Sequence, residues 1–586
     1  MFLSRRSFLF ASLGGLLAVV GATFGSCGGA NGTSRPVLPN FGVVDPLNAV
    51  EVDLILARAV ASLATNDLHV AVVDRTGLLL GAYSTAGSTV QDEDNIALSL
   101  ARTTAFFSNS QAPLSSRTVE TLSTFHFPPT FANELIPSPL PESTGLGLFP
   151  NSVIAPQRTT TGIVGTPQGP LWQINSTNRG AAIESGLTTP PTTFNLDAAF
   201  NFAQFFPSRN IDGSFPSPGI TLLPGAVPLY KAGRLVGGVG CYVRRAGVRP
   251  PVAGAAEGDP DVAAAEFAAI SGASGSGAPG DENFFLAIPP EGAITIVGIL
   301  LPYVKQTTRP AGYAQGVFPG LPGFDPNFLV PLGNGQIDPF GYLIGPRAAQ
   351  TASESGEFLN LTDVTTIIDQ VVASANITRA QVRLPLGSAA KVIATIVDRR
   401  GLILAHFRME DTLCDAVDVV PAKARSTVYF CQPGGPAAAD RGTDPALFPL
   451  FDVSLHPRGL AFTTRTLGFL SQPFFPPGID ENSGTPGPLF QLALANRLPG
   501  QVDRWGTEIP DDGYQNGLTF FPGSVPLYKN GELVGALGVS GDGVEQNDLI
   551  AFDGGRGFEP PPELQIENFT YLGVRLPYLK FPQTPR

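Results

Sequence analysis

The sequence contains one succession of motifs twice. The segment VAVVDRTGLLLGAY (70–83) recurs as ATIVDRRGLILAHF (394–407), and ARTTAFF (101–107) recurs as ARSTVYF (424–430). Further pairs of short motifs follow in the same order, with different loop lengths between them. Matched blocks that keep their order over this length indicate an ancient duplication, so each copy is expected to be one folding unit.

The repeats set the expected domain boundaries within the 586 residues. The first repeat covers 47–308 and the second covers 359–586. Residues 309–358 between them are rich in glycine and proline and lack hydrophobic periodicity, which predicts a linker laid across the surface. A chain of this length exceeds one ordinary hydrophobic core, so two units also agree with its size.

Each repeat has the same expected order of elements. An amphipathic helix comes first, with apolar residues such as Ile367 and Val371 at helical spacing. A hairpin follows at DRTG or DRRG, because aspartate bonds the nearby backbone and glycine accepts a positive φ. A second helix surrounds Arg425, and Asn530-Gly531 suits the two-residue turn of a later hairpin. Strands and helices that mix without regular alternation predict an α+β (mixed α/β) fold: two tandem repeats, each a mainly antiparallel β-sheet flanked by helices.

The N-terminal segment predicts export. Arg5 and Arg6 stand before a weakly apolar, glycine-interrupted stretch, which is the layout of a twin-arginine signal over residues 1–27. The alternatives are an ordinary secretory signal or a single membrane anchor, for which the stretch is short. The motif FGSC also resembles a lipoprotein cleavage site, so Cys27 is a candidate for lipidation and a membrane tether. Residues 28–46 are a flexible linker, and the protein is expected in the periplasm or cell envelope.

The charge of the chain argues against nucleic-acid binding, and the spacing of its cysteines argues against a disulfide. The formal net charge is −13 and there is no long basic run, so a nucleic acid would be repelled. Hydrophobic residues make up 43% of the chain, enough for buried cores. A helix expected over 416–430 would hold Cys414 and Cys431 about 20 Å apart, too far for a disulfide. We therefore predict buried, unpaired thiols.

The second repeat contains the motifs IVDRRG (396–401), FRMED (407–411), PAKARST (421–427) and GVSGDGVEQND (538–548). In this combination it resembles the GlcG/HbpS-like haem-binding protein family, whose fold also occurs in the C-terminal domain of PduO-type proteins. The first repeat keeps both hairpins but lacks the RM and VSGDG motifs. The resemblance extends over both repeats as two tandem copies, each with long insertions relative to the compact family unit.

The resemblance implies self-association, as a possible homo-oligomer, and in some members binding of haem or a related tetrapyrrole. Strand alternation places His406 and Arg408 on one face and Met409 on the other. His406 is then the candidate iron ligand, and Arg408 the partner of a propionate. Met409 and the loop residue His456 complete the candidate cofactor site. The alternative is that His406 is a half-buried strand residue, Arg408 a structural ion-pair partner and His456 a surface histidine.

Two further motifs carry possible chemistry. Asp542, Glu545 and Asp548 could bind a hard cation, but we expect them to cap the following helix and stay solvated. Ser540 in GVSG lacks the second glycine of a nucleophile elbow and has no histidine nearby in the sequence. HExxH, CxxC and CxxCH motifs are also missing from the sequence. These patterns argue against a hydrolase or a c-type cytochrome, so no catalytic residue is assigned and a non-enzyme is preferred.

Three functions stay open on this basis. The preferred one is an exported haem- or tetrapyrrole-binding protein that carries, stores or senses its ligand. The alternative is a non-catalytic cell-envelope scaffold or interaction protein that uses the same fold. The third is an enzyme that uses a bound cofactor. The lack of a recognised catalytic group favours the first two, and export of an already folded protein agrees with cofactor loading before export.

Overall fold

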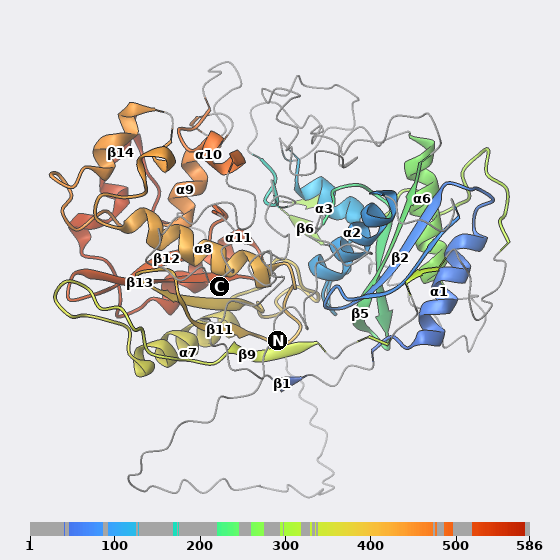
Figure 1. Cartoon of the computed structure of the whole chain (residues 1–586), viewed down its shortest axis with the longest axis horizontal. Helices are drawn as coiled ribbons and strands as arrows, with labels where there is room; N and C mark the ends of the chain where they lie inside the picture. Colours follow the sequence, from blue (N-terminus) through green and yellow to red (C-terminus); the bar gives the residue numbers. More distant parts are fainter. Residues whose placement is uncertain are drawn as a thin grey trace, which may run out of the picture. The chain divides into compact units, whose positions relative to one another are not determined.

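Two antiparallel sheets with the same strand order organise the chain, as the computed structural model shows (Figure 1). The first sheet has the order β4-β5-β2-β3-β8 and the second the order β12-β13-β10-β11-β9-β1. The structure describes residues 40–41, 46–85, 92–124, 127, 168–172, 174, 220–244, 259–274, 294–296, 298–317, 328–330, 334–335, 338–442, 444–472, 475–476, 486–495 and 518–580. We call residues 46–330 the first half and residues 338–580 the second half.

Apart from the edge strands β8 and β9, the main helices and strands of the two halves follow in matching order. The first half contains α1 (Ala49–Ala61), β2 (Leu68–Asp74), β3 (Leu79–Ser84), α2 (Asp92–Phe107), α3 (Ser116–Leu122), β4 (Ala226–Lys231), β5 (Arg234–Val243), α6 (Pro260–Ala273), β6 (Thr295–Ile296), β7 (Ile299–Leu300) and β8 (Phe328–Val330). The second half contains β9 (Pro339–Ile344), α7 (Leu361–Ile377), β10 (Ile393–Asp398), β11 (Ile403–Arg408), α8 (Ala416–Cys431), α9 (Thr464–Leu470), α10 (Phe490–Ala495), β12 (Ser524–Lys529), β13 (Glu532–Ser540), α11 (Val544–Gly554), β14 (Thr570–Tyr571) and β15 (Val574–Arg575). The short strand β1 (Asn40–Phe41) pairs with β9.

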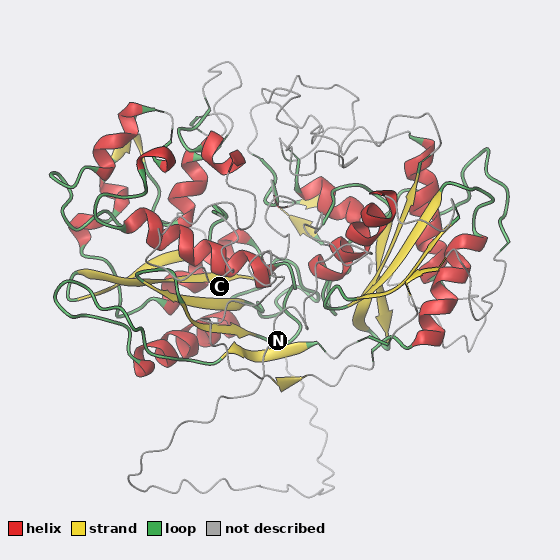
Figure 2. Cartoon of the chain, viewed as in Figure 1, coloured by secondary structure: helices red, strands yellow, loops and turns green. Residues whose placement is uncertain are grey.

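Helices cover both faces of each sheet (Figure 2). In the first half, α1 and α6 pack on one face and α2 on the other. In the second half, α7 and α11 pack on one face and α8 on the other. The apolar clusters beneath α2 and α8 are continuous with each other, and residues 37–586 group into one compact unit. The predicted α+β class with antiparallel sheets flanked by helices is confirmed.

The turns form for the reason that the sequence indicated. The Oδ1 atom of Asp398 accepts hydrogen bonds from the backbone N–H groups of Arg400 and Leu402, at 2.8 and 3.0 Å. Gly401 follows with φ of 83°. Asp74 makes the equivalent bonds in the first half. At the later hairpin, Asn530 and Gly531 both have positive φ, as a two-residue turn of type I′ requires.

The first helix of each half begins with the same device. Asn48 and Glu51 form a capping box at α1, and Asn360 and Asp363 form one at α7. A lysine from the matching hairpin then reaches the acidic residue: Lys529 Nζ lies 2.9 Å from Asp363 Oδ2, and Lys231 pairs with Glu51 in the same way. These interactions fix the helix start against the sheet.

The predicted linker contributes to both sheets. Within residues 309–358, β8 pairs with β3 and β9 pairs with β11, so each sheet gains an edge strand. Hydrophobic periodicity gave no sign of these strands, because their pairing is decided by the sheet edge that each one meets.

The halves differ in the segment that follows the matched helices α2 and α8. In the first half, α2 is followed by the short turn 108–115 and then by α3. In the second half, α8 is followed by residues 432–463, which include the 3₁₀-helices Ala438–Asp440 and Pro445–Phe451. We call residues 432–463 the lobe. Phe451 of the lobe stacks on Phe462, with ring centroids 5.4 Å apart, and Phe462 packs near Phe430 at the end of α8.

The predicted export signal, including Cys27, and almost all of the linker 28–46 lie outside the described residues. Among the residues that the structure describes, no helix has the length and apolar character needed to cross a membrane. Cys241, Cys414 and Cys431 are buried free thiols, as predicted.

Candidate functional site

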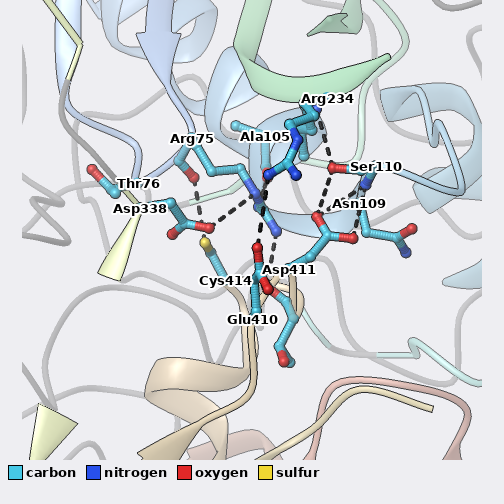
Figure 3. Close-up of polar contacts among 12 residues, drawn as sticks. Arg75, Thr76, Ala105, Asn109, Ser110, Arg234, Asp338, Glu410, Asp411 and Cys414 are labelled. Carbon is cyan, nitrogen blue, oxygen red and sulfur yellow. Dashed lines mark hydrogen bonds and ion pairs between the residues drawn. The ribbon is translucent and has the colours of Figure 1, made fainter. Parts of the chain in front are cut away.

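A buried polar network joins the two halves (Figure 3). Arg75, in the DRTG turn of the first half, donates to the carbonyl oxygen of Thr412 at 2.8 Å, and its Nε lies 3.8 Å from Asp338 Oδ2. Asp338 also accepts hydrogen bonds from both terminal nitrogens of Arg408, at 2.6 and 3.1 Å. Cys414 donates to the carbonyl oxygen of Arg75. One carboxylate therefore lies between arginines from the two halves.

A second contact in the same region involves Asp411. Its carboxylate accepts hydrogen bonds from the backbone N–H and the hydroxyl of Ser110 in the first half, at 2.9 to 3.1 Å. Arg383 Nη1 donates to it at 2.8 Å. Burial alone would raise the pKa of Asp411, but the positive charges of Arg383 and Arg75 outweigh burial and lower it. The ionised carboxylate thus holds the turn after α2 against the second half.

The predicted iron ligand His406 is a core residue of β11. Its side chain is 1% exposed, and its Nδ1 lies 2.6 Å from Thr395 Oγ1 on the neighbouring strand β10. Burial, helped by the positive charge of Arg408, lowers the pKa of His406 to about 3. The imidazole is therefore neutral at physiological pH, and it is shielded from solvent.

Arg408 lies on the same face of β11 as His406 and is fully buried. Its guanidinium donates to Asp338 and to the carbonyl oxygens of Pro339 and Thr412. Burial would lower the pKa of Arg408, but Asp338 more than compensates and raises it. Arg408 is therefore a charged structural partner in the network between the halves.

The other two predicted cofactor residues lie elsewhere. Met409 packs into the apolar cluster on the opposite face of the sheet, together with Leu404. His456 belongs to the lobe and is half-buried, with its ring 5.1 Å from that of Phe569. Burial lowers the pKa of His456 although Asp452 opposes the shift. The structure brings His406 and Arg408 together and separates them from Met409 and His456.

A cavity lies where the two halves meet. It encloses about 70 Å³, and about 640 Å³ of empty space when adjoining open solvent is counted. The first half contributes apolar residues to its lining, among them Phe107, Leu114, Leu122 and Leu171. The second half contributes the polar residues Gln381, Asp415, Lys423, Ser540, Asp542 and Asn547. None of the four predicted cofactor residues lines this cavity or the cavity of about 490 Å³ in the lobe.

Lys423 is the central polar residue of the cavity. It lies on α8 and is 1% exposed, and its Nζ is 2.8 Å from the carbonyl oxygen of Pro522, 3.1 Å from that of Val539 and 3.0 Å from Ser540 Oγ. Burial lowers the pKa of Lys423 to about 7, against the opposing effects of Asp415 and Asp548. Burial likewise raises the pKa of Asp415 to about 7. Burial therefore favours the neutral form of both groups.

The acidic residues Asp542, Glu545 and Asp548 were expected to cap α11 and stay solvated, and the structure differs from this expectation. Asp548 is 4% exposed and pairs with Arg465 at 2.6 Å, so it is not solvated. Asp542 accepts from the backbone N–H groups of Gln381 and Gly543, and burial raises its pKa. Gly543 is the residue before α11, which starts without a side-chain cap. Within the described residues, no group of three His, Cys, Asp or Glu side chains could hold a metal ion.

Sequence reasoning missed the pairing of Lys423 with Ser540, because 117 residues separate them. The available signal was that PAKARST and GVSGDG both occur in the second repeat and both change in the first. Leu100 occupies the position of Lys423 in α2, and Tyr242 occupies the position of Ser540 at the end of β5. The polar cavity wall thus belongs to the second half.

Part of the second half matches a known protein family. The fold class of the chain is an α+β sheet flanked by helices, and residues 492–555 match the family model of haem degrading protein HbpS-like. That segment includes β12, β13 and α11, and so the wall of the cavity that carries Ser540 and Asp542. The comparison with curated proteins gives no match.

Solved structures similar to parts of this chain include the following three. A complex of PduOC with haem is 20% identical, covers 34% of this chain and 93% of its own, and has a TM-score of 0.19. Klebsiella pneumoniae protein ORFY is 19% identical and covers 35% and 94%, with a TM-score of 0.19. A double mutant of Streptomyces reticuli HbpS is 17% identical and covers 36% and 99%, with a TM-score of 0.18.

Proposed function

We propose that this chain is an exported protein that binds haem or a related tetrapyrrole through its second half. The observation that carries the proposal is the match of residues 492–555 to the HbpS-like family model. This matched segment contributes part of the cavity lining, including Ser540 and Asp542, and the motifs RM and VSGDG occur in the second half only. The first half is proposed to be a diverged copy of the same unit, which the shared strand order supports.

The side chains first assigned to the ligand do not fit a haem as the structure holds them. His406 has the neutral imidazole that iron requires, yet its side chain is 1% exposed. Both terminal nitrogens of Arg408 already donate to Asp338. The cavity volume of about 70 Å³ is small beside the ~300–1,000 Å³ of an ordinary ligand pocket. The roles of His406, Arg408, Met409 and His456 in cofactor binding therefore stay predictions from the sequence.

A haemin titration tests the proposal. The chain without residues 1–27 is titrated with haemin and the visible spectrum is recorded for wild type, His406→Ala and His456→Ala. We expect a saturable Soret band at stoichiometric haemin. A band shifted in one variant assigns the iron ligand to that histidine, and a band unchanged in both places the macrocycle elsewhere on the second half.

No band at stoichiometric haemin would overturn the proposal and favour the second candidate, a non-catalytic cell-envelope scaffold. One observation favours that candidate: Arg75, Asp338 and Arg408 use their charges to join the halves. Export to the periplasm or envelope and lipidation of Cys27 belong to the proposal as well. Mass spectrometry of the mature protein from a bacterial host tests them, since a cleaved chain that begins with diacylated Cys27 is expected.

A further inference from the structure

Lys423 Nζ has three hydrogen-bond partners, which are the carbonyl oxygens of Pro522 and Val539 and the hydroxyl of Ser540. A carbonyl can only accept a hydrogen bond, whereas a hydroxyl can also donate one. A protonated Lys423 donates to all three oxygens. Once Lys423 is neutral, the two carbonyls accept its two hydrogens and its lone pair faces the Ser540 hydroxyl, which is the arrangement of a base and a nucleophile.

Burial makes the neutral amine accessible near physiological pH. Lys423 is 1% exposed, and its pKa of about 7 follows from loss of solvation. The charged groups that face it are Asp415 and Asp548, which raise its pKa, and Arg465, which lowers it. Since Arg465 is itself paired with Asp548, the field of those two partly cancels at Lys423.

Ser540 borders a cavity that can hold a small substrate. It lies at the end of β13 and lines the cavity between the halves, together with Gly541, Gly543 and Val544. Val544 is the first residue of α11, an 11-residue helix. The N-terminal end of a helix favours negative charge, such as that which develops on an acyl oxygen under attack. The first half lines the cavity with apolar residues, against which a small uncharged acyl group can pack.

We propose that Ser540 is a nucleophile and Lys423 its general base, and that the pair transfers acyl groups from small esters to water. In the first step Ser540 Oγ bonds to the acyl carbon while its proton moves to Lys423 Nζ. The bond from that carbon to the ester oxygen then breaks, and the departing alcohol takes the proton from Lys423. A water molecule attacks the acyl-serine with the same base, which releases the carboxylic acid and restores the Ser540 hydroxyl.

This activity goes beyond tetrapyrrole binding and does not depend on it. In the first half, Leu100 holds the position of Lys423 and has no basic group. Tyr242 holds the position of Ser540 and has no aliphatic hydroxyl. The reaction is therefore confined to the second half. The cavity volume of about 70 Å³ favours a small acyl group.

Covalent labelling of the full-length protein tests the pair. Methanesulfonyl fluoride is small enough for the cavity, and attack forms the serine O–S bond while the S–F bond breaks. We expect one adduct at Ser540 by peptide mass spectrometry, with a labelling rate that rises with pH and has its midpoint near 7. Hydrolysis of p-nitrophenyl acetate is expected to be lost in the labelled protein.

Variants separate the roles of the two residues. Lys423→Met is expected to slow labelling of Ser540 by about 10²- to 10⁴-fold, the range of general-base catalysis. Ser524→Ala is the matched control, since it removes another buried serine hydroxyl from the neighbouring strand β12 and leaves the rate unchanged. Circular dichroism verifies that each variant is folded.

Two results would overturn the proposal. One is a wild-type protein without an adduct at Ser540 between pH 5 and 9 at large excess of reagent, a result that no misfolded variant can mimic. The other is a folded Lys423→Met protein that is labelled as fast as the wild type, which would leave Lys423 a structural role only.

Discussion

Leu100 and Lys423 occupy the same position in two matched helices. The side chain of Leu100 approaches Gly225, and Lys423 Nζ approaches Gly523, where each glycine precedes the equivalent hairpin. Each glycine also accepts a backbone hydrogen bond from the facing strand, donated by Cys241 or by Val539. A single helix position is thus apolar in one half and ionisable in the other.

Replacement of Lys423 is expected to change how stability depends on pH. Because the folded pKa of about 7 is below the value of 10.5 for an ordinary lysine, the unfolded chain binds the extra proton between these pH values. Wild-type stability therefore rises with pH across this window by up to about 1.4 kcal/mol per unit from this group. Urea unfolding of wild type and Lys423→Met from pH 7 to 10 measures the difference. If the free energies of unfolding of the two proteins change with pH in parallel, the lowered pKa of Lys423 is contradicted.

Loss of Asp338 is expected to destabilise the protein strongly. Asp338→Ala leaves Arg408 charged and buried, which costs about 3–5 kcal/mol in the free energy of unfolding. The control is Glu410→Ala, which removes an exposed pair between the halves, Arg234 and Glu410 at 3.7 Å, and costs at most about 1 kcal/mol. Equal losses in denaturant titrations of the two variants would show that the buried network contributes no more than a surface pair.

His406 is expected to stay neutral until the protein unfolds in acid. Its folded pKa of about 3 is below the usual 6.5, so its contribution to stability is present above pH 6.5 and is lost as the pH falls toward 3. His406→Gln should therefore show a weaker loss of stability over this range than wild type. NMR titration of the imidazole provides the direct measurement. A midpoint near 6.5 for His406 in the folded protein would refute its burial.

Gly523 is expected to tolerate no side chain. Its φ is +121°, and a Cβ there would lie 2.5 Å from the carbonyl oxygen of Val539 and 2.8 Å from the side chain of Asn547. Steric overlap in Gly523→Ala should thus lower the free energy of unfolding by about 1–3 kcal/mol, in addition to the cost of backbone strain. Gly557 also has positive φ, but nothing lies within 4 Å of its Cβ position, so Gly557→Ala reports the strain alone. Thermal unfolding of both variants gives the comparison.

The fold was predictable wherever the determinants are local. Asp398 and Gly401 specify their hairpin within four residues, and apolar spacing specified α1 and α7. The edge strands β8 and β9 were not predictable, because a glycine- and proline-rich segment becomes a strand only when it meets an open sheet edge.

The candidate site was only partly predictable. Alternation along β11 correctly placed His406 and Arg408 on one face, but it could not reveal that Asp338 neutralises Arg408. The expectation of a solvated acidic cluster was wrong for Asp548, since Arg465 comes from a distant helix. Ser540 gave no catalytic signal on its own, because its partner Lys423 is brought to it by the packing of α8 on the sheet.

The lobe gives the matched helices α2 and α8 different surroundings at their C-terminal ends. The turn that follows α2 contacts the second half, where Asn109 donates to Val382 and Ser110 donates to Asp411. After α8 the chain continues into the lobe, and Phe462 of the lobe packs near Phe430. The end of α8 is therefore covered by its own half, whereas the turn after α2 is left to form the contact between the halves.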